Sequence, residues 1–277
     1  MYKGRKVYAI VLAAGSGRRM HSKTKKQFME ILGRPLFSWS ASRFDRHDAV
    51  DGIILTTGEE DIPYMEELTG RQGACPLQKL SAIVAGGKER YNSVFEGLKK
   101  VAELEKLDTA SSDTGMPSSG TQDPLIMIHD CARPMLTDAI IDDALHYAEK
   151  YHAAVVGMPV KDTIKVLDAD HFVKETPERS SLWLMQTPQS FDFSLIYKAY
   201  AALICQDESG QLMIPVTDDA MVVESFAGQR VKIIPGSYEN IKVTTPEDVK
   251  IAELYLRKSS ENGWQAKHLS ILYLSRS

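Results

Sequence analysis

Cysteine, excess positive charge and long apolar runs are all scarce in this sequence. Its three cysteines, Cys75, Cys131 and Cys205, are odd in number and far apart, which argues against a disulfide framework or a zinc site. A net charge of −4 and a pI near 6.0 indicate no basic surface for nucleic acid. No apolar run approaches membrane-spanning length, and the N-terminal run stops at Gly15, which excludes a signal peptide. We therefore expect a cytoplasmic protein that binds neither nucleic acid nor membranes.

A third glycine is missing from the glycine-rich segment near the N-terminus. An apolar run over residues 7–13 leads to Gly15 and Gly17, and Met20 stands where the dinucleotide-binding pattern G-x-G-x-x-G has its last glycine. Residues 18–26 are rich in arginine and lysine instead. Backbone N–H groups in such a turn bind anions, and the added cations favour a polyphosphate. The segment predicts a nucleotide whose phosphates react and disfavours an NAD(P)-dependent oxidoreductase.

The 277 residues, 43% of them hydrophobic, are enough for one large α/β domain. Apolar, β-branched runs alternate with stretches of helical periodicity, which predicts a mostly parallel sheet with helices on both faces. The expected strands cover residues 7–13, 52–57, 81–85, 125–129 and 153–159, and the expected helices cover residues 37–44, 61–68, 91–104 and 138–151.

Three segments depart from this alternation. Residues 108–123 are rich in Ser, Thr, Gly and Asp and predict a disordered insertion. Residues 160–186 predict a protruding β-arm that is too exposed to be stable alone, so we expect a homodimer formed through this arm. Residues 258–277 fit neither pattern and are expected to form a C-terminal tail, which leaves a single domain over residues 1–257.

Asp130 closes the fourth expected strand, within the run His129-Asp130-Cys131-Ala132-Arg133-Pro134. Ligands of parallel sheets bind at the carboxyl ends of strands. A carboxylate there, facing a phosphate loop, suits Mg²⁺, which binds one or two carboxylates together with phosphate oxygens. The alternative is that Asp130 only caps a turn before the proline. His129 and Cys131 are expected to pack in the core.

Later motifs offer more polar groups. Thr217 is expected to cap a helix that begins at Asp218, and Asp218 is a candidate second carboxylate near the metal. Lys242 is expected inside a short strand, from which it would reach phosphates from the side opposite Lys26. Gly86 and Gly87 would let the backbone approach a planar base closely, although by themselves they fit an ordinary strand-to-helix turn better.

The ordered motifs together resemble the 2-C-methyl-D-erythritol 4-phosphate cytidylyltransferase family of the non-mevalonate isoprenoid pathway. The resemblance spans roughly residues 7–256 without the insertion, and its motifs are A-A-G-S-G-R-R-M, K-Q-F, G-G-x-E-R-x-x-S-V, H-D-x-A-R-P, V-K-D-T-I-K, T-P-x-R-x-x-L-W, Q-T-P-Q-x-F, T-D-D-A and N-I-K-V-T-x-P-E-D. It implies a Rossmann-like nucleotidyltransferase fold with a dimerisation arm. It also implies transfer of CMP from CTP to a polyol phosphate, with Mg²⁺ as cofactor.

The resemblance further implies a role for each matching residue. The catalytic cations would be Arg19, Lys26 and Lys242. CTP would contact Ala13, Ala14, Gly15, Gly17, Gly86, Gly87, Ser93 and Asp130, and Asp130 would hold Mg²⁺. The sugar phosphate would contact Thr163, Arg179, Thr187, Thr217 and Asp218, and the arm residues Thr163 and Arg179 would serve the other subunit's site. Some relatives carry an acidic residue where this chain has Lys88, so a base contact there would come from the backbone.

The nearest alternative is a ribitol-5-phosphate cytidylyltransferase, which shares the glycine loop, K-Q, H-D-x-x-R-P and N-I-K-V-T-T-P. The arm motifs V-K-D-T-I-K, T-P-E-R and L-W favour the isoprenoid enzyme. A non-catalytic nucleotide-binding protein is disfavoured because Lys26, Asp130 and Lys242 occur together.

Overall fold

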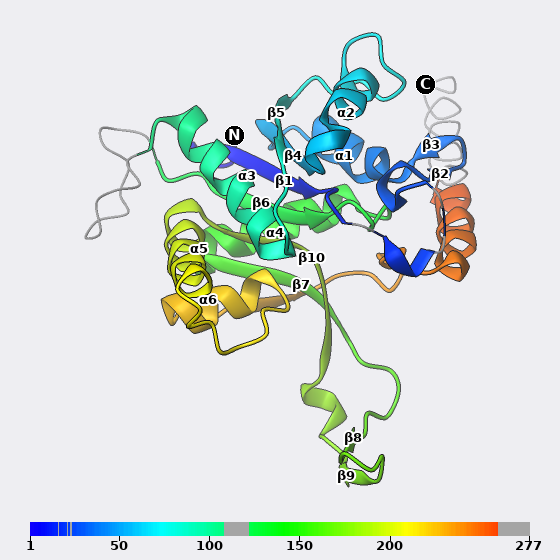
Figure 1. Cartoon of the computed structure of the whole chain (residues 1–277), viewed down its shortest axis with the longest axis vertical. Helices are drawn as coiled ribbons and strands as arrows, with labels where there is room; N and C mark the ends of the chain where they lie inside the picture. Colours follow the sequence, from blue (N-terminus) through cyan, green and yellow to red (C-terminus); the bar gives the residue numbers. More distant parts are fainter. Residues whose placement is uncertain (16, 21, 23, 108–121, 260–277) are drawn as a thin grey trace, which may run out of the picture.

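The computed structural model describes residues 1–15, 17–20, 22, 24–107 and 122–259 (Figure 1). The predicted insertion, apart from its last two residues, lies outside the described residues. The predicted tail lies outside them from residue 260 onward, while residues 246–259 are helical. No helix of the described part combines the length and apolar character needed to cross a membrane.

A seven-stranded sheet forms the centre of the described fold, in the order β11-β7-β10-β6-β1-β4-β5 (Figure 1). β1 pairs in parallel with β4 and β6, and β4 pairs in parallel with β5. The five predicted strands are confirmed: β1 (Val7–Leu12), β4 (Gly52–Thr57), β5 (Leu80–Ala85), β6 (Leu125–Asp130) and β7 (Ala153–Pro159). Every residue of β4 and β6 is buried, as expected for parallel strands covered on both faces.

Two strands of this sheet were not predicted. β10 (Trp183–Asp192) runs antiparallel to both β6 and β7, and β11 (Lys232–Pro235) pairs in parallel with β7. The register of β10 against β7 shifts between Met185 and Gln189, and the Thr187–Pro188 peptide inside this shift is cis. Such a bulge redirects side chains. β2 (Glu30–Ile31) and β3 (Arg34–Pro35) form a separate short hairpin.

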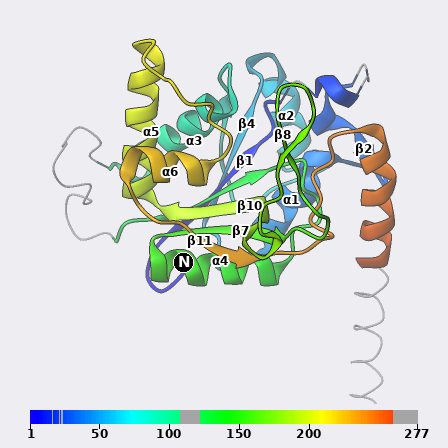
Figure 2. The same ribbon diagram turned by 90° about the horizontal axis from the view of Figure 1, so that it is seen from below.

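Helices cover both faces of the sheet, which confirms the predicted α/β class. Alternate residues of β1 point into two different cores: Val7, Ala9 and Val11 pack on one side, and Tyr8 and Ile10 on the other. The first core is covered by α1 (Leu36–Arg46), α2 (Ile62–Thr69) and α4 (Asp138–Tyr151), and the second by α3 (Arg90–Glu105), α5 (Phe193–Glu208) and α6 (Asp219–Ala227). Figure 2 shows α4 on one side of β7 and β10, with α5 and α6 on the other.

Short 3-10 helices lie in the loops at the carboxyl edge of the sheet and in the arm. They are η1 (Arg18–Met20), η2 (Lys26–Phe28), η3 (Glu59–Asp61) and η4 (Arg179–Ser181). A third cluster of buried residues contains Met20, Ala132, Val243, Ala252 and Leu256. It joins η1 to the loop after β6, to the 240–244 loop and to the helix over residues 246–259.

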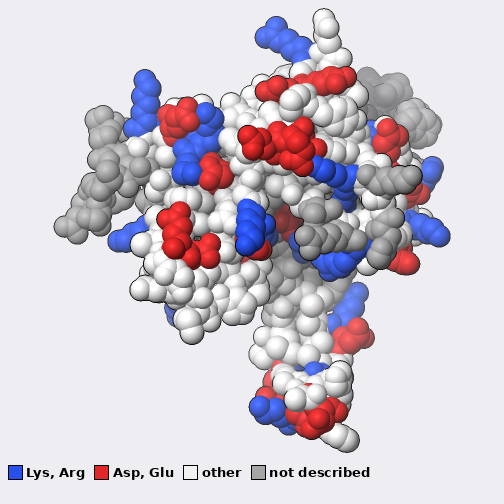
Figure 3. Space-filling model, in the orientation of Figure 1, with Lys and Arg blue, Asp and Glu red and all other residues white. Residues whose placement is uncertain are grey.

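Residues between β7 and β10 project from the body, with β8 (Val166–Leu167) and β9 (Val173–Glu175) paired antiparallel at the far end (Figure 1). Both signs of charge occur at this end (Figure 3). Large apolar side chains are nevertheless exposed on it, among them Phe172 at 72% and Val173 at 58%. The projection has the predicted shape of an arm, while its role in a dimer and the division into one domain, arm and tail stay predictions.

Candidate active site

Two adjoining cavities open where the carboxyl ends of β1, β5 and β6 meet the 240–244 loop. The first has a volume of about 380 Å³ and lies between the two glycine-rich loops, and the second has about 280 Å³ and lies beside β10 and the start of α6. Arg90, Asp130 and Lys242 line both of them. In Figure 3, lysine and arginine side chains lie on both sides of the hollow in the middle of the face shown. Two connected cavities that share charged walls suit two anionic substrates.

The turn after β1 places a glycine against Lys26. Gly17 has a φ of +60°, and a Cβ added there would lie 2.8 Å from Cβ of Lys26, so a side chain at this position would be strained and would displace the lysine. Met20, which replaces the third glycine of the dinucleotide pattern, is buried with Ala132 and Val243. Its burial ties the end of the turn to the loops that carry Asp130 and Lys242.

The second glycine loop packs against the first. A Cβ on Gly86 would lie 2.5 Å from Cβ of Ala14 and 2.7 Å from Oγ of Ser93, and a Cβ on Gly87 would lie 2.3 Å from Cβ of Asn92. The Gly87 amide donates to Oγ of Ser93 at 3.1 Å. This packing requires glycines whether or not a base binds, so it accommodates both of the interpretations offered for the sequence.

Most of the residues predicted to bind the nucleotide lie at the first cavity, some of them lining it and others directly behind the lining. Ala14, Gly15, Lys26, Gly87, Ser93, Asp130 and Lys242 line the first cavity, and so does Lys88. Ala13, Gly17 and Gly86 support that lining from behind, through the core and through the contacts just described. Arg19, in η1, is exposed and is absent from the described residues that line either cavity.

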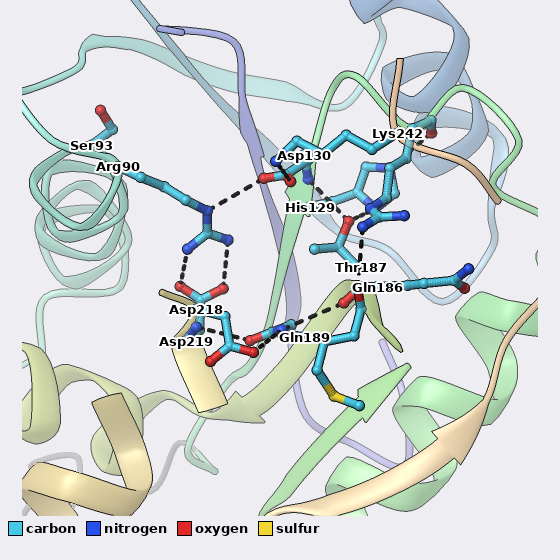
Figure 4. A network of polar contacts seen from close by, with 12 residues as sticks. Arg90, Ser93, His129, Asp130, Gln186, Thr187, Gln189, Asp218, Asp219 and Lys242 are labelled. Carbon is cyan, nitrogen blue, oxygen red and sulfur yellow. Dashed lines mark hydrogen bonds and ion pairs between the residues drawn. The ribbon is translucent and has the colours of Figure 1, made fainter. Parts of the chain in front are cut away.

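Asp130 is 8% exposed and lies between two cations. Nζ of Lys242 donates to Oδ2 at 2.6 Å, and Nε of Arg90 lies 3.4 Å from Oδ1 (Figure 4). Burial alone would raise the pKa of this carboxyl, but Arg90 and then Lys242 outweigh it and hold the pKa well below its usual range. The side chain is therefore a carboxylate, and the contacts above pair its oxygens with side-chain cations instead of with the backbone amides that a turn cap would bind.

Both ring nitrogens of His129 are hydrogen-bonded. The Asp130 amide donates to Oγ1 of Thr187, which contacts Nδ1 of His129 at 3.0 Å, and Nε2 lies 3.1 Å from the Arg133 carbonyl. A carbonyl only accepts, so Nε2 carries the proton and Nδ1 accepts from Thr187. Burial lowers the pKa of His129 to about 4 and raises that of the Cys131 thiol to about 12. Both residues pack in the core as predicted, and neither is suited to act as a base or nucleophile near neutral pH.

The two lysines reach the first cavity from different elements. Lys26 is part of η2, and burial lowers the pKa of its ammonium group. The prediction of a strand around Lys242 is wrong, because residues 240–244 form an irregular loop. The Val243 amide donates to the Ala132 carbonyl, and the Thr244 amide donates to the Asp248 carboxylate, so these groups are unavailable to a sheet.

The second cavity collects Thr187, Thr217 and Asp218. The prediction that Thr217 caps α6 is wrong, since Asp218 is the N-cap and its Oδ1 accepts from the Met221 amide at 2.9 Å. Oδ2 of Asp218 accepts from Nε2 of Gln189. Each oxygen of Asp218 thus accepts one hydrogen bond, and its role as a second metal carboxylate stays a prediction.

The two arm residues lie apart from both cavities of their own chain. Thr163 and Arg179 are exposed, and Nη1 of Arg179 donates to the Lys161 carbonyl within the arm. Sequence reasoning missed Arg90, Arg133, Gln186 and Gln189 as members of the cavity walls. All four did lie inside quoted motifs, which was the available signal for them.

The donor set favours a divalent cation that arrives with phosphates. Among the described residues, no group of three or more His, Cys, Asp or Glu side chains could hold a metal ion. Mg²⁺ needs only one or two carboxylates when phosphate oxygens and water complete its coordination. Asp130 fits this requirement, because it is charged and borders both cavities.

Comparison with known proteins agrees with this geometry. The family model of 2-C-methyl-D-erythritol 4-phosphate cytidylyltransferase matches residues 7–258. Curated proteins of that name from Lachnospira eligens and Clostridium botulinum are 41% and 38% identical to this chain, each over 90% of it and over 98% and 96% of their own lengths. The crystal structure of 4-diphosphocytidyl-2C-methyl-D-erythritol synthase from Anaerococcus prevotii is similar with a TM-score of 0.70 at 31% identity, covering 92% of this chain and 97% of that one. The chain therefore belongs to the 2-C-methyl-D-erythritol 4-phosphate cytidylyltransferase family.

Proposed function

We propose that this enzyme transfers CMP from CTP to 2-C-methyl-D-erythritol 4-phosphate, releasing pyrophosphate, in the non-mevalonate route to isoprenoid precursors. Family membership supports this activity. The structural observation that carries it is the meeting of Lys26, Asp130 and Lys242 around the first cavity, next to a second cavity of suitable size for a sugar phosphate.

The chemistry needs no nucleophilic side chain. A phosphate oxygen of the acceptor forms a bond to the α-phosphorus of CTP, and the bond from that phosphorus to the bridging oxygen of pyrophosphate breaks. The acceptor phosphate is already an anion, in keeping with a neutral, enclosed His129 and a protonated Cys131. The enzyme's task is to position the two substrates and to stabilise the charge that develops on the transferred phosphoryl group.

The basic side chains divide this task. Lys26 and Lys242 line the first cavity and would bind the phosphates of CTP and of the acceptor. Arg19 is exposed on η1 next to the turn and would join them from solvent when the triphosphate is present. Asp130 would hold Mg²⁺, which supplies additional positive charge to the phosphoryl oxygens when bound.

The remaining predicted residues would recognise the two substrates. Cytidine would lie against the two glycine-rich loops, at Ala13, Ala14, Gly15, Gly17, Gly86, Gly87 and Ser93. The sugar phosphate would occupy the second cavity beside Thr187, Thr217 and Asp218. Thr163 and Arg179 would complete that cavity from the arm of a second subunit, in a homodimer whose contacts cover the exposed apolar residues of the arm. A cytoplasmic location stays a prediction.

The test is CTP-dependent release of pyrophosphate in the presence of Mg²⁺, with methylerythritol phosphate or ribitol 5-phosphate as acceptor. We expect release with methylerythritol phosphate and none above background with ribitol 5-phosphate. Release with ribitol 5-phosphate alone would overturn the acceptor, and no release with either would overturn the proposed function.

A further inference from the structure

Arg90 stands in the wall between the two cavities and lines both. It is the first residue of α3, directly after the second glycine loop. Its Nη1 and Nη2 donate to the two carboxylate oxygens of Asp219 at 2.8 and 2.7 Å, while its Nε faces Oδ1 of Asp130 at 3.4 Å (Figure 4). The guanidinium group of Arg90 thus joins Asp130, in the site, to Asp219, which is absent from the described residues that line either cavity.

Asp219 is a fixed anchor for this guanidinium. Its side chain is fully buried at the start of α6, and the Tyr200 hydroxyl donates to it. Its amide donates to Oε1 of Gln189 at 2.9 Å, which ties the anchor to β10. Removing Arg90 from Asp219 would leave a buried charge without an ionic partner, which is strongly unfavourable. Arg90 therefore stays in place, whatever phosphates enter the cavities.

The two cations beside Asp130 differ in how firmly the structure holds them in place. Lys242 has a flexible stem, its side chain is 38% exposed, and it lines both cavities, so it is free to turn toward a phosphate. Arg90 has a planar, forked guanidinium with both Nη groups committed to Asp219. Of the two, only Arg90 can remain beside Asp130 throughout the reaction.

We propose that Arg90, anchored on Asp219, is a positioning residue that keeps the Asp130 carboxylate oriented toward the substrate phosphates and their divalent cation while Lys242 leaves to bind phosphate. The proposal rests on the proposed function.

The test measures binding of Mn²⁺ to the enzyme in the presence of CTP, by electron paramagnetic resonance of the free ion, alongside kcat and Tm. Arg90→Lys keeps the charge but cannot bridge the two carboxylates, and Asp219→Asn removes the anchor. For both we expect Mn²⁺ affinity to fall by about 10- to 100-fold, the usual effect of losing a group that orients a metal ligand. We expect kcat to fall with it.

Two further variants separate positioning from folding. Tyr200→Phe removes one hydrogen bond to Asp219 and leaves its contacts with Arg90, so we expect a lower Tm with Mn²⁺ affinity within about twofold of wild type. The double variant Arg90→Met, Asp219→Leu removes both charges together, which leaves no unpaired buried charge and favours a folded protein. We expect this variant to bind Mn²⁺ as weakly as Arg90→Lys.

Wild-type Mn²⁺ affinity in the folded double variant, or in Arg90→Lys, would overturn the proposal and assign Arg90 a purely structural role. The pyrophosphate assay on the wild-type enzyme tests the proposed function separately, because Mn²⁺ binding in the presence of CTP needs no acceptor and no turnover.

Discussion

Nζ of Lys242 lies 2.6 Å from Oδ2 of Asp130, although the two residues are 112 positions apart in the sequence. The pair brings the loop before the last helix of the described chain to the end of β6. Lys242 helps to lower the pKa of Asp130 and so favours its charged form. Asp130 in turn accepts a hydrogen bond from Lys242, which lines both cavities.

Asp130→Asn tests the importance of this carboxylate. The amide has the same size but no charge, so it forms no ion pair with Lys242 or Arg90 and is a much weaker ligand of a divalent cation. We expect kcat to fall by roughly 100-fold or more, the scale found when a group that stabilises the transition state is removed. Steady-state kinetics over a range of Mg²⁺ concentrations measures this. Activity close to that of the wild type would exclude Asp130 from metal binding.

Lys26→Ala tests the ammonium group in the first cavity. We expect kcat to fall by roughly 100-fold or more, because a cation next to the reacting phosphoryl group is lost. The matched control is Lys25→Ala, since Lys25 pairs with Asp61 and Glu60 at the surface and borders neither cavity among the described residues. We expect the control to keep kcat within about twofold, as exposed ion pairs contribute little. Equal losses in the two variants would refute a specific role for Lys26.

Mixing two differently impaired subunits, at an acceptor concentration well below the KM of Arg179→Ala, tests whether the site is shared. Arg179→Ala should weaken binding of the sugar phosphate and raise its KM, because Arg179 would serve the site of the other subunit. An equal mixture of Lys26→Ala and Arg179→Ala chains should recover about a quarter of wild-type activity after subunit exchange, since half of the dimers carry one intact site of two. Lys26→Ala mixed with Asp130→Asn is the control, as both changes affect the same chain's cavity. No recovery in the first mixture would argue against a shared site.

Phe172→Asp tests the contact that the arm would make. Phe172 is 72% exposed at the end of the arm, and a charge there should prevent burial against a second subunit. We expect sedimentation velocity to show a shift from dimer to monomer at micromolar concentration. Met213→Asp, at a residue that is 87% exposed outside the arm, is the control and should leave the dimer unchanged. A monomeric wild-type protein would contradict the prediction directly.

His129 predicts a specific loss of stability in mild acid. Its folded-state pKa of about 4 lies below the ordinary value of 6.5, so the unfolded chain binds the proton more readily. The contribution to stability is complete above pH 6.5 and is lost as the pH falls toward 4, by about 3 kcal/mol in total. Urea unfolding of the wild type and of His129→Gln at pH 7, 6, 5 and 4.5 measures the difference. The variant should lose less stability over this range, and parallel curves would rule out His129 as the titrating group.

The predictions from sequence succeeded where a residue's surroundings follow from its neighbours in the chain. The strands β1, β4, β6 and β7 were recognised because their residues are apolar and β-branched over a continuous run. β10 was missed because its buried part contains Gln186, Thr187, Gln189 and Ser190, and polar residues predict exposure. Three of these polar side chains pair with distant partners: Gln186 with the Ser237 carbonyl, Thr187 with His129, and Gln189 with Asp218.

In the site, too, features set by neighbours in the chain were predicted, and features set by distant partners were not. The glycine loops, Lys26 and Asp130 were found because each belongs to a compact motif at a strand end. The pairing of Arg90 with Asp219 spans 129 positions, and no local pattern contains it. The cap of α6 was assigned one residue too early, to Thr217, because threonine and aspartate are both good caps and only the backbone angles distinguish them.

The burial of Met20 has a consequence for any attempt to convert this fold to bind a dinucleotide. Substituting glycine there would complete the G-x-G-x-x-G pattern in the sequence. In the molecule it would open a hole among Ala132, Val243 and the last helix of the described chain, and so detach the phosphate turn from the two loops that present its partner charges. The buried methionine packs three loops together, and a substitution that improves the match to the motif would separate the loops that form the site.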